Sequence, residues 1–144
     1  MKTVMAQGTF DVLHPGHIHY LENSLKLGDK LVVVVARDSR VSGKKELFFD
    51  EKERKQMLES LDVVDRAVLG VEGDIYETVE KIDPDVITLG HDQNHFPEEV
   101  RELAETATGH KVEVERISES VEDYSSSDIK KFNSDQVKKT HREI

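Results

Sequence analysis

Two histidines lie three residues apart, among small and turn-forming residues, near the N-terminus. The run reads Gly8-Thr9-Phe10-Asp11-Val12-Leu13-His14-Pro15-Gly16-His17. Pro15 suits the first turn of a helix, Gly8 is expected to let a strand turn sharply, and Gly16 removes a side chain where a ligand approaches the backbone. A helix N-terminus has unpaired N–H groups and a partial positive charge, and imidazoles beside it can donate hydrogen bonds to phosphate oxygens. We therefore predict a phosphate-binding site at His14 and His17.

Basic side chains for the same ligand are expected in a polar loop over residues 37–49. Lys44 and Lys45 lie in this loop, which can close over a polyphosphate and exclude water. The alternative is a solvated basic turn. Farther along, Ser126 and Ser127 precede an expected helix, where their hydroxyls either bind phosphate or simply cap the helix.

The elements that position these groups follow from the pattern of apolar residues. Strands are expected at residues 2–7, 31–36, 64–69, 85–89 and 111–117. Helices are expected at residues 15–27 and 74–82, and as segments that begin at Asp50, at Pro97 and near Ser126. Strands that alternate with helices imply one α/β domain with a single Rossmann-like, doubly wound sheet of five parallel strands. Ligands bind at the carboxyl ends of such strands, and the first strand leads directly into the histidine run.

Three local patterns refine this fold. Residues 31–36 are apolar on both faces, which is typical of a central strand covered by helices on both sides. Residues 111–117 alternate apolar with charged side chains, which favours an edge strand. Asp50 and Glu53 have the spacing of a capping box, so a helix is expected to begin there.

The composition narrows the class of function. The chain has 144 residues, 30 Asp and Glu against 20 Lys and Arg, a net charge of −10 and no cysteine. Nucleic-acid binding needs clustered basic residues, so the acidic balance argues against it. The lack of cysteine excludes disulfides and thiolate metal sites. We expect one domain at residues 1–135, a polar tail at 136–144, no membrane contact and a cytoplasmic location.

The histidine run resembles the signature of the cytidylyltransferase-like nucleotidyltransferases. Companion residues match at the family's spacings: Tyr20, Leu21, Leu27, Gly28, Asp29, Asp38, Glu53, Arg54, Val64, Asp65, Leu89, Gly90 and Asp92. The resemblance implies transfer of a nucleoside monophosphate from a nucleoside triphosphate to a phosphorylated acceptor, with release of pyrophosphate. Catalysis would then come from groups that bind the charge developing at the α-phosphate.

The resemblance also implies roles for individual residues. The catalytic residues would be His14, His17 and Lys44, with Lys45 beside them in the phosphate loop. The nucleotide-binding residues would be Gly8, Thr9, Phe10, His14, Pro15, Gly16, His17, Asp92, Tyr124, Ser126 and Ser127. Asp11 is expected to orient its loop, and Arg54 either to reach the phosphates or to fix the loop. A magnesium ion would bridge the phosphates, although the sequence offers no carboxylate cage for it.

The segment Tyr124-Ser125-Ser126-Ser127 resembles the archaeal FAD synthase branch of the family, which transfers AMP from ATP to FMN. The Arg-Thr-x-Gly-Ile-Ser-Thr form of glycerol-3-phosphate cytidylyltransferases is absent, and Arg116 lies ten residues before Ser126. FAD synthesis is therefore the leading prediction. The alternatives are a CTP-dependent cytidylyltransferase acting on glycerol 3-phosphate or a similar phosphate, an adenylyltransferase of the ADP-heptose type, and a nucleotide- or metal-binding module without catalysis. Family members commonly form dimers, which implies a homodimer.

Overall fold

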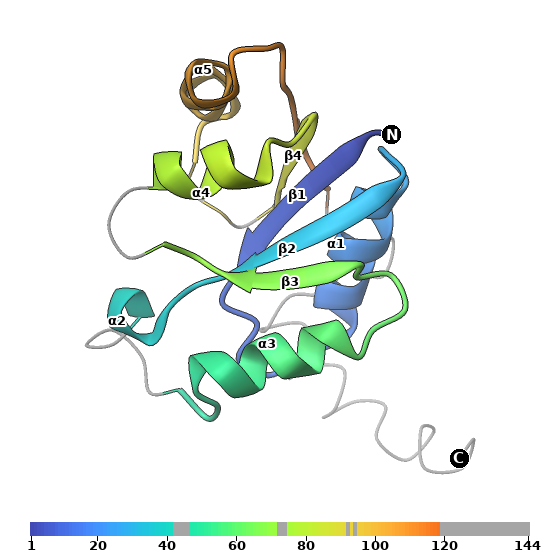
Figure 1. Ribbon diagram of the computed structural model, residues 1–144. Helices are drawn as coiled ribbons and strands as arrows, with labels where there is room; N and C mark the ends of the chain where they lie inside the picture. Colours follow the sequence, from blue (N-terminus) through green and yellow to red (C-terminus); the bar gives the residue numbers. More distant parts are fainter. Residues whose placement is uncertain (42–46, 72–74, 92, 94, 119–144) are drawn as a thin grey trace.

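The computed structural model describes residues 1–41, 47–71, 75–91, 93 and 95–118. Five parallel strands form one sheet in the order β3-β2-β1-β4-β5 (Figure 1). The strands are β1 (Thr3–Gly8), β2 (Lys30–Val35), β3 (Arg66–Leu69), β4 (Val86–Leu89) and β5 (Glu113–Arg116). The helices are α1 (Pro15–Leu25), α2 (Asp38–Val41), α3 (Glu51–Glu59), α4 (Ile75–Ile82) and α5 (Pro97–Thr108). The prediction of a five-stranded parallel α/β sheet is confirmed.

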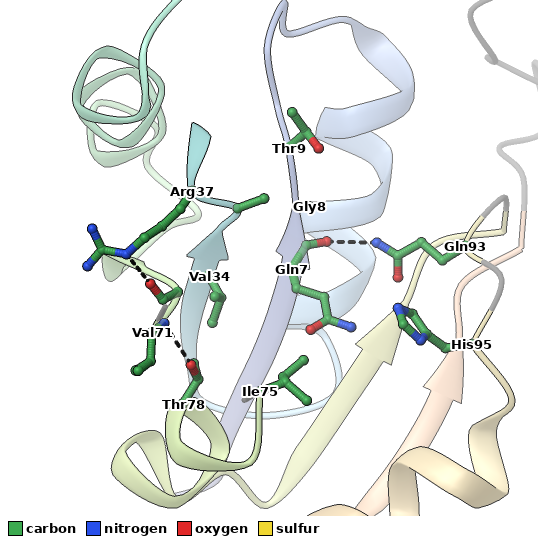
Figure 2. A pocket seen from close by; sticks show the side chains of 12 residues that line it. Gln7, Gly8, Thr9, Val34, Arg37, Val71, Ile75, Thr78, Gln93 and His95 are labelled. Carbon is green, nitrogen blue, oxygen red and sulfur yellow. Dashed lines mark hydrogen bonds between the residues drawn. The ribbon is translucent and has the colours of Figure 1, made fainter. Parts of the chain in front are cut away.

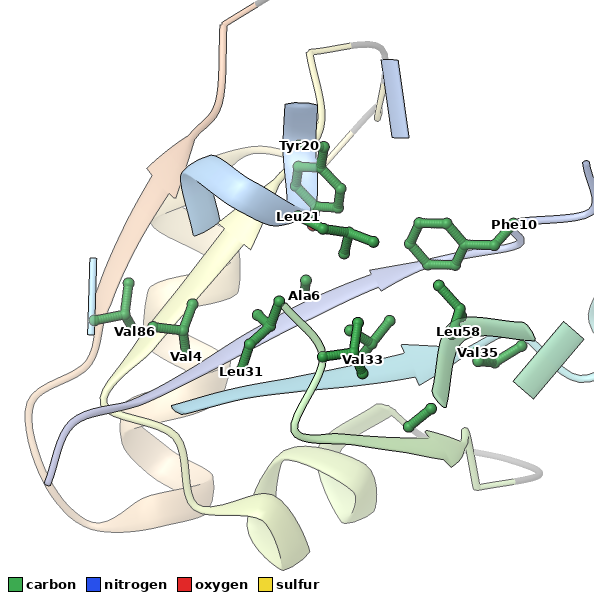
Figure 3. Close-up of a cluster of buried hydrophobic side chains, with 12 residues drawn as sticks. Val4, Ala6, Phe10, Tyr20, Leu21, Leu31, Val33, Val35, Leu58 and Val86 are labelled. Carbon is green, nitrogen blue, oxygen red and sulfur yellow. The ribbon is translucent and has the colours of Figure 1, made fainter. Parts of the chain in front are cut away.

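Helices cover both faces of this sheet, as a doubly wound fold requires. On one face, α1 contributes Tyr20 and Leu21 and α3 contributes Leu58 to a buried cluster (Figure 3). On the other face, α4 contributes Val79 and α5 contributes Ala104 to a second cluster. The chain runs outward from β1 to β3 and then returns to β4 on the other side of β1. The strand order therefore reverses between β1 and β4, the point at which ligands bind in such folds.

Side-chain alternation along the central strands divides the core between the two faces. Val4 and Ala6 of β1 join the cluster under α1 and α3, whereas Met5 joins the cluster under α4 and α5. Residues 31–35 of β2 are all buried, which confirms the predicted central strand. Exposed Glu113 and Glu115 show that β5 is the predicted edge strand. None of the helices within the described ranges has the length and apolar content needed to cross a membrane.

The segment after β2 differs from the predicted plain loop because it contains the short helix α2. Its first residue, Asp38, accepts a hydrogen bond from Arg54 at 2.6 Å, and its N–H donates to Glu51 Oε1 at 2.9 Å. A four-residue helix is unstable by itself, so these tertiary contacts hold it in place. The local sequence shows no pattern of apolar residues from which this helix could be predicted. The helix expected near Ser126 and the tail at 136–144 lie outside the described residues.

Candidate active site

The two predicted histidines cap the N-terminus of α1. The Nδ1 atom of His14, the N-cap residue, accepts a hydrogen bond from the Gly16 N–H at 3.0 Å. The Nδ1 atom of His17 accepts one from the His14 N–H at 3.3 Å. This is a reciprocal capping box in which histidines take the places usually held by Ser or Thr and by Glu or Gln. The helix thus begins where Pro15 predicts, and both imidazoles lie at its positive end.

The capping bonds also determine where the neutral imidazoles carry their protons. A neutral imidazole has one donor and one acceptor nitrogen, so an Nδ1 that accepts a hydrogen bond places the proton on Nε2. Both rings therefore have an Nε2–H donor. The rings of His14 and His17 are stacked, with centroids 3.8 Å apart and an angle of 26° between their planes. Two stacked imidazoles that each carry a donor at a helix N-terminus suit the oxygens of a polyphosphate.

The turn between β1 and α1 is made by Phe10 rather than by Gly8. Phe10 has a φ of 53°, in the left-handed region that residues with a side chain seldom adopt. A Cβ atom at Gly8 would lie only 2.8 Å from the Phe10 ring, so Gly8 is required by this close approach. The buried Phe10 ring also packs edge to face against His17, with centroids 5.3 Å apart. Phe10 therefore packs against His17 and helps to hold its ring. The chain makes its turn at Phe10, not at Gly8 as predicted.

Asp11 orients the loop as predicted. Its carboxylate accepts hydrogen bonds from the Phe48 N–H, at 3.1 and 3.0 Å, and from the Phe49 N–H, at 3.0 Å. These bonds join the turn after β1 to the segment that leads into α3. The carboxylate thereby fixes the turn that leads to the histidine pair against the segment before α3.

Arg54 fixes the same region from within the core. The side chain is completely buried, and it donates to the carbonyl oxygens of Thr9 and Ala36, each at 2.8 Å, and of Phe49 at 3.1 Å. It also forms the 2.6 Å ion pair with Asp38. Of the two predicted roles for Arg54, the structure supports the one in which it fixes the loops.

The loop after β4 is held by Arg116 and Gln93. Arg116 donates to the carbonyl oxygens of Gly90 and Gln93, each at 2.8 Å, and also to that of His95. The Gln93 amide accepts from the Gly90 N–H at 3.1 Å and donates to the Gln7 carbonyl at 2.9 Å (Figure 2). Arg116 is therefore a structural clamp of this loop.

A cavity of about 430 Å³ opens at the carboxyl ends of β1, β2 and β3. Its lining comes from these strand ends, from the start of α4 and from the loop after β4 (Figure 2). The lining residues are Gln7, Gly8, Thr9, Val34, Ala36, Arg37, Gly70, Val71, Ile75, Thr78, Gln93 and His95. Only Gly8 and Thr9 among them were predicted as site residues. For the other lining residues the sequence offered one signal, which is the polar Gln7 at the end of an otherwise apolar central strand.

Comparison with known proteins decides the family. The family model described as cytidylyltransferase-like matches residues 5–132. The chain belongs to the cytidylyltransferase-like family. A FAD synthase from Halalkalicoccus jeotgali is 55% identical over 95 residues, which cover 66% of this chain and 67% of the relative. A FAD synthase from Picrophilus torridus is 48% identical over 130 residues, which cover 89% and 93% of the two chains.

A solved structure resembles this cytidylyltransferase-like chain throughout most of its length. It is described as the lipopolysaccharide core biosynthesis protein from Thermoplasma volcanium and is 49% identical, with a TM-score of 0.78. The match covers 87% of this chain and 99% of that one. The likeness confirms the fold.

Several predicted residues of this cytidylyltransferase-like protein lie outside the described ranges. They are Lys44, Lys45, Asp92, Tyr124, Ser126 and Ser127. The structure does bring together Gly8, Thr9, His14, Pro15, Gly16 and His17 at the carboxyl end of β1. Their roles toward a nucleotide stay predictions.

The described residues contain no cluster of three His, Asp or Glu side chains that could hold a metal ion. His19, which follows the histidine pair on α1, instead contacts the Ser118 carbonyl through Nε2 at 3.3 Å and the Asn23 amide through Nδ1 at 3.1 Å. These contacts give His19 a structural role at the surface of α1.

Proposed function

We propose that this protein is a FAD synthase that transfers AMP from ATP to FMN and releases pyrophosphate. The names of the similar proteins from Halalkalicoccus jeotgali and Picrophilus torridus support FMN as the acceptor and ATP as the donor. The predicted nucleotidyltransferase activity is confirmed by these relatives and by the family. The observation that carries the reaction at this site is the reciprocal histidine cap, because it leaves the proton of each neutral imidazole on Nε2 in two rings that lie at the positive end of α1.

The chemistry requires charge stabilisation and alignment. A phosphate oxygen of FMN attacks the α-phosphorus of ATP, and the bond from that phosphorus to the bridging oxygen of the leaving pyrophosphate breaks. The attacking phosphate is already an anion near neutral pH, so it needs no strong base. His14 and His17 are proposed to bind the triphosphate and its developing charge, with Lys44 and Lys45 adding positive charge. Asp92, Tyr124, Ser126 and Ser127 are proposed as further nucleotide contacts.

A divalent cation is proposed to arrive with the triphosphate. The donor set of the described residues does not fit a metal cage, because no three carboxylate or imidazole groups converge there. Mg²⁺ bound to ATP oxygens needs few protein ligands, since it keeps several waters and binds substrate phosphates. A homodimer, a cytoplasmic location and a domain boundary near residue 135 stay predictions.

A substrate matrix tests the proposed function. Purified protein with Mg²⁺ is incubated with ATP or CTP and with FMN, glycerol 3-phosphate, phosphoethanolamine, phosphopantetheine or a heptose 1-phosphate. Pyrophosphate release and chromatography of the products are measured together. We expect FAD from ATP and FMN. A product from CTP and glycerol 3-phosphate, or from ATP and the sugar phosphate, without any FAD would refute the assignment.

The structural comparison gives a specific reason to include heptose 1-phosphate among the acceptors. The similar structure from Thermoplasma volcanium is described as a lipopolysaccharide core biosynthesis protein, which favours a sugar phosphate as the second candidate acceptor. A protein named FAD synthase from the same organism is 53% identical to this chain over 120 residues. Direct competition between FMN and heptose 1-phosphate for ATP ranks the two acceptors by their kcat/KM values.

A further inference from the structure

The cavity and the histidine pair lie on opposite faces of the sheet and meet at its carboxyl edge. Gln7 and Val34 project toward the face covered by α4, and Ile75 of α4 closes the cavity from that side (Figure 2). The N-terminus of α1 lies on the other face, and Gly8 and Thr9 form the edge between them. A ligand whose phosphate binds at this edge can therefore place its remaining atoms in the cavity.

The walls of the cavity combine an apolar surface with few available polar groups. Val34, Val71 and Ile75 provide the apolar surface. The Thr78 hydroxyl is engaged, because it accepts from the Val71 N–H at 3.0 Å. Arg37 donates to the Gly70 carbonyl at 2.5 Å and pairs with Glu51 at 3.2 Å. These contacts stabilise the walls of the cavity.

The Gln7 side-chain amide differs from these groups. Its backbone is fixed, because its N–H donates to Tyr20 Oη at 3.2 Å and its carbonyl accepts from Gln93 at 2.9 Å. The side-chain amide, in contrast, has no hydrogen-bond partner within the described part of the chain. It points into the space that Ile75 and His95 also line (Figure 2). A fixed backbone with an unpaired primary amide offers one donor group and one acceptor to a ligand.

We propose that this cavity holds the isoalloxazine ring of FMN and that the Gln7 amide pairs with the pyrimidinedione edge of that ring. The proposal rests on the FAD synthase function proposed above. The edge presents an N–H between two carbonyl groups, which matches an amide oxygen that accepts and an amide N–H that donates. FMN has a single phosphate, so most of its affinity must come from burying its large ring, and an apolar cavity supplies that burial. ATP has three phosphates for the positive end of α1.

Adenine is the competing occupant, because a glutamine amide can also pair with an adenine edge. The two occupants are distinguished by substituting Gln7 with leucine and measuring both Michaelis constants. We expect Gln7→Leu to raise the KM for FMN about tenfold through the lost hydrogen bonds, and to leave the KM for ATP within about twofold of the parent. The matched control is Gln56→Leu, because Gln56 is exposed on α3, away from the cavity. The control should change neither KM.

A second variant tests the cavity without relying on the amide. Ile75→Trp fills the space, so FMN fluorescence should no longer respond to the protein in the presence of a non-hydrolysable ATP analogue. Binding of that analogue alone, measured by calorimetry, should persist, and this result also shows that the variant is folded. If the parent makes FAD and both variants keep the parent KM for FMN, the cavity assignment is wrong and the proposed function stands. A selective rise of the KM for ATP in Gln7→Leu also overturns the cavity assignment. A parent that makes no FAD overturns the assignment together with the proposed function.

Discussion

At the scale of single residues, His14 has two separable tasks. Its Nδ1 atom caps α1 through the Gly16 N–H, whereas its Nε2–H is the proposed donor to the triphosphate. Asparagine is among the best N-cap residues but has no donor at the Nε2 position. We expect His14→Asn to change the free energy of unfolding by less than about 1 kcal/mol and to lower kcat/KM about 100-fold. Urea denaturation and steady-state kinetics measure the two effects.

The alanine variant is the comparison that separates these tasks. His14→Ala removes both the cap and the donor, so it should lose about 1 kcal/mol of stability in addition to the loss of activity. If His14→Asn retained the activity of the parent, the imidazole donor would have no part in transfer. If both variants unfolded at the same urea concentration, the capping role would be wrong.

Arg54 shows how a residue from the family signature can act at a distance from the ligand. Four hydrogen bonds of its buried guanidinium reach Thr9, Ala36, Phe49 and Asp38. We expect Arg54→Met to lower the free energy of unfolding by about 3–5 kcal/mol, because the variant leaves buried acceptors without donors. Chemical denaturation tests this, and Arg54→Lys should lose less because it keeps one charged donor group. Loss of activity with unchanged stability in Arg54→Met would instead favour direct contact with substrate.

At the scale of elements, the turn after α4 is linked to the turn after α5 by His110 and Asp83. The His110 Nε2 lies 2.8 Å from Asp83 Oδ1 and its Nδ1 lies 2.8 Å from the Lys111 carbonyl oxygen. The Lys111 hydrogen bond first, and then the Asp83 carboxylate, raise the pKa of His110 above its ordinary value of 6.5. Protonated His110 therefore stabilises the fold fully below that ordinary value, and the contribution is lost as pH rises through the raised pKa.

Removing the Asp83 charge tests this linkage. Asp83 has a φ of 55°, and asparagine tolerates this left-handed conformation, so Asp83→Asn changes the charge with little backbone strain. We expect the pKa of His110 to fall in Asp83→Asn, followed by NMR titration of the imidazole. The melting temperature of the parent should also decrease more between about pH 5.5 and about pH 8.5 than that of the variant. An unchanged His110 titration in the variant would contradict the assigned cause.

Elements with a strong local signal could be predicted from the sequence, and those held by distant contacts could not. The Asp50–Glu53 capping box is present, with bonds of 2.8 and 3.2 Å, because both partners lie within one helical turn. The apolar run of β2 identified a central strand for the same local reason. Helix α2 was missed because Arg54 and Glu51, from another helix, hold its first residue. The positive φ of Phe10 was missed because it accompanies burial of the Phe10 ring in the core cluster under α1 and α3, which no local pattern signals.

At the scale of the whole molecule, the two halves of the site differed in how far sequence could predict them. The proposed phosphate-binding half is one continuous segment, so the spacing of His14 and His17 was enough to predict that both lie at the N-terminus of α1. The cavity is assembled from β1, β2, β3, α4 and the loop after β4, which become neighbours only when the sheet forms. Gln7 is a polar residue on a buried strand, and its place in the cavity wall can be recognised only once the other elements are assembled around it. A discontinuous pocket of this kind has no sequence spacing from which to be recognised.

The net charge of −10 leads to a prediction about ionic strength. Both proposed substrates are anions, so the long-range field of the acidic protein opposes their approach, while the donors at α1 act only at short range. Salt screens charges beyond roughly 8 Å at physiological ionic strength and weakens contacts inside a binding site much less. We therefore expect kcat/KM for ATP at constant Mg²⁺ to rise as NaCl increases from about 0.01 to about 0.15 M, whereas kcat at saturating substrates should stay constant. A steady fall of kcat/KM over that range would mean that a positive local field, rather than the net charge, governs the approach of the nucleotide.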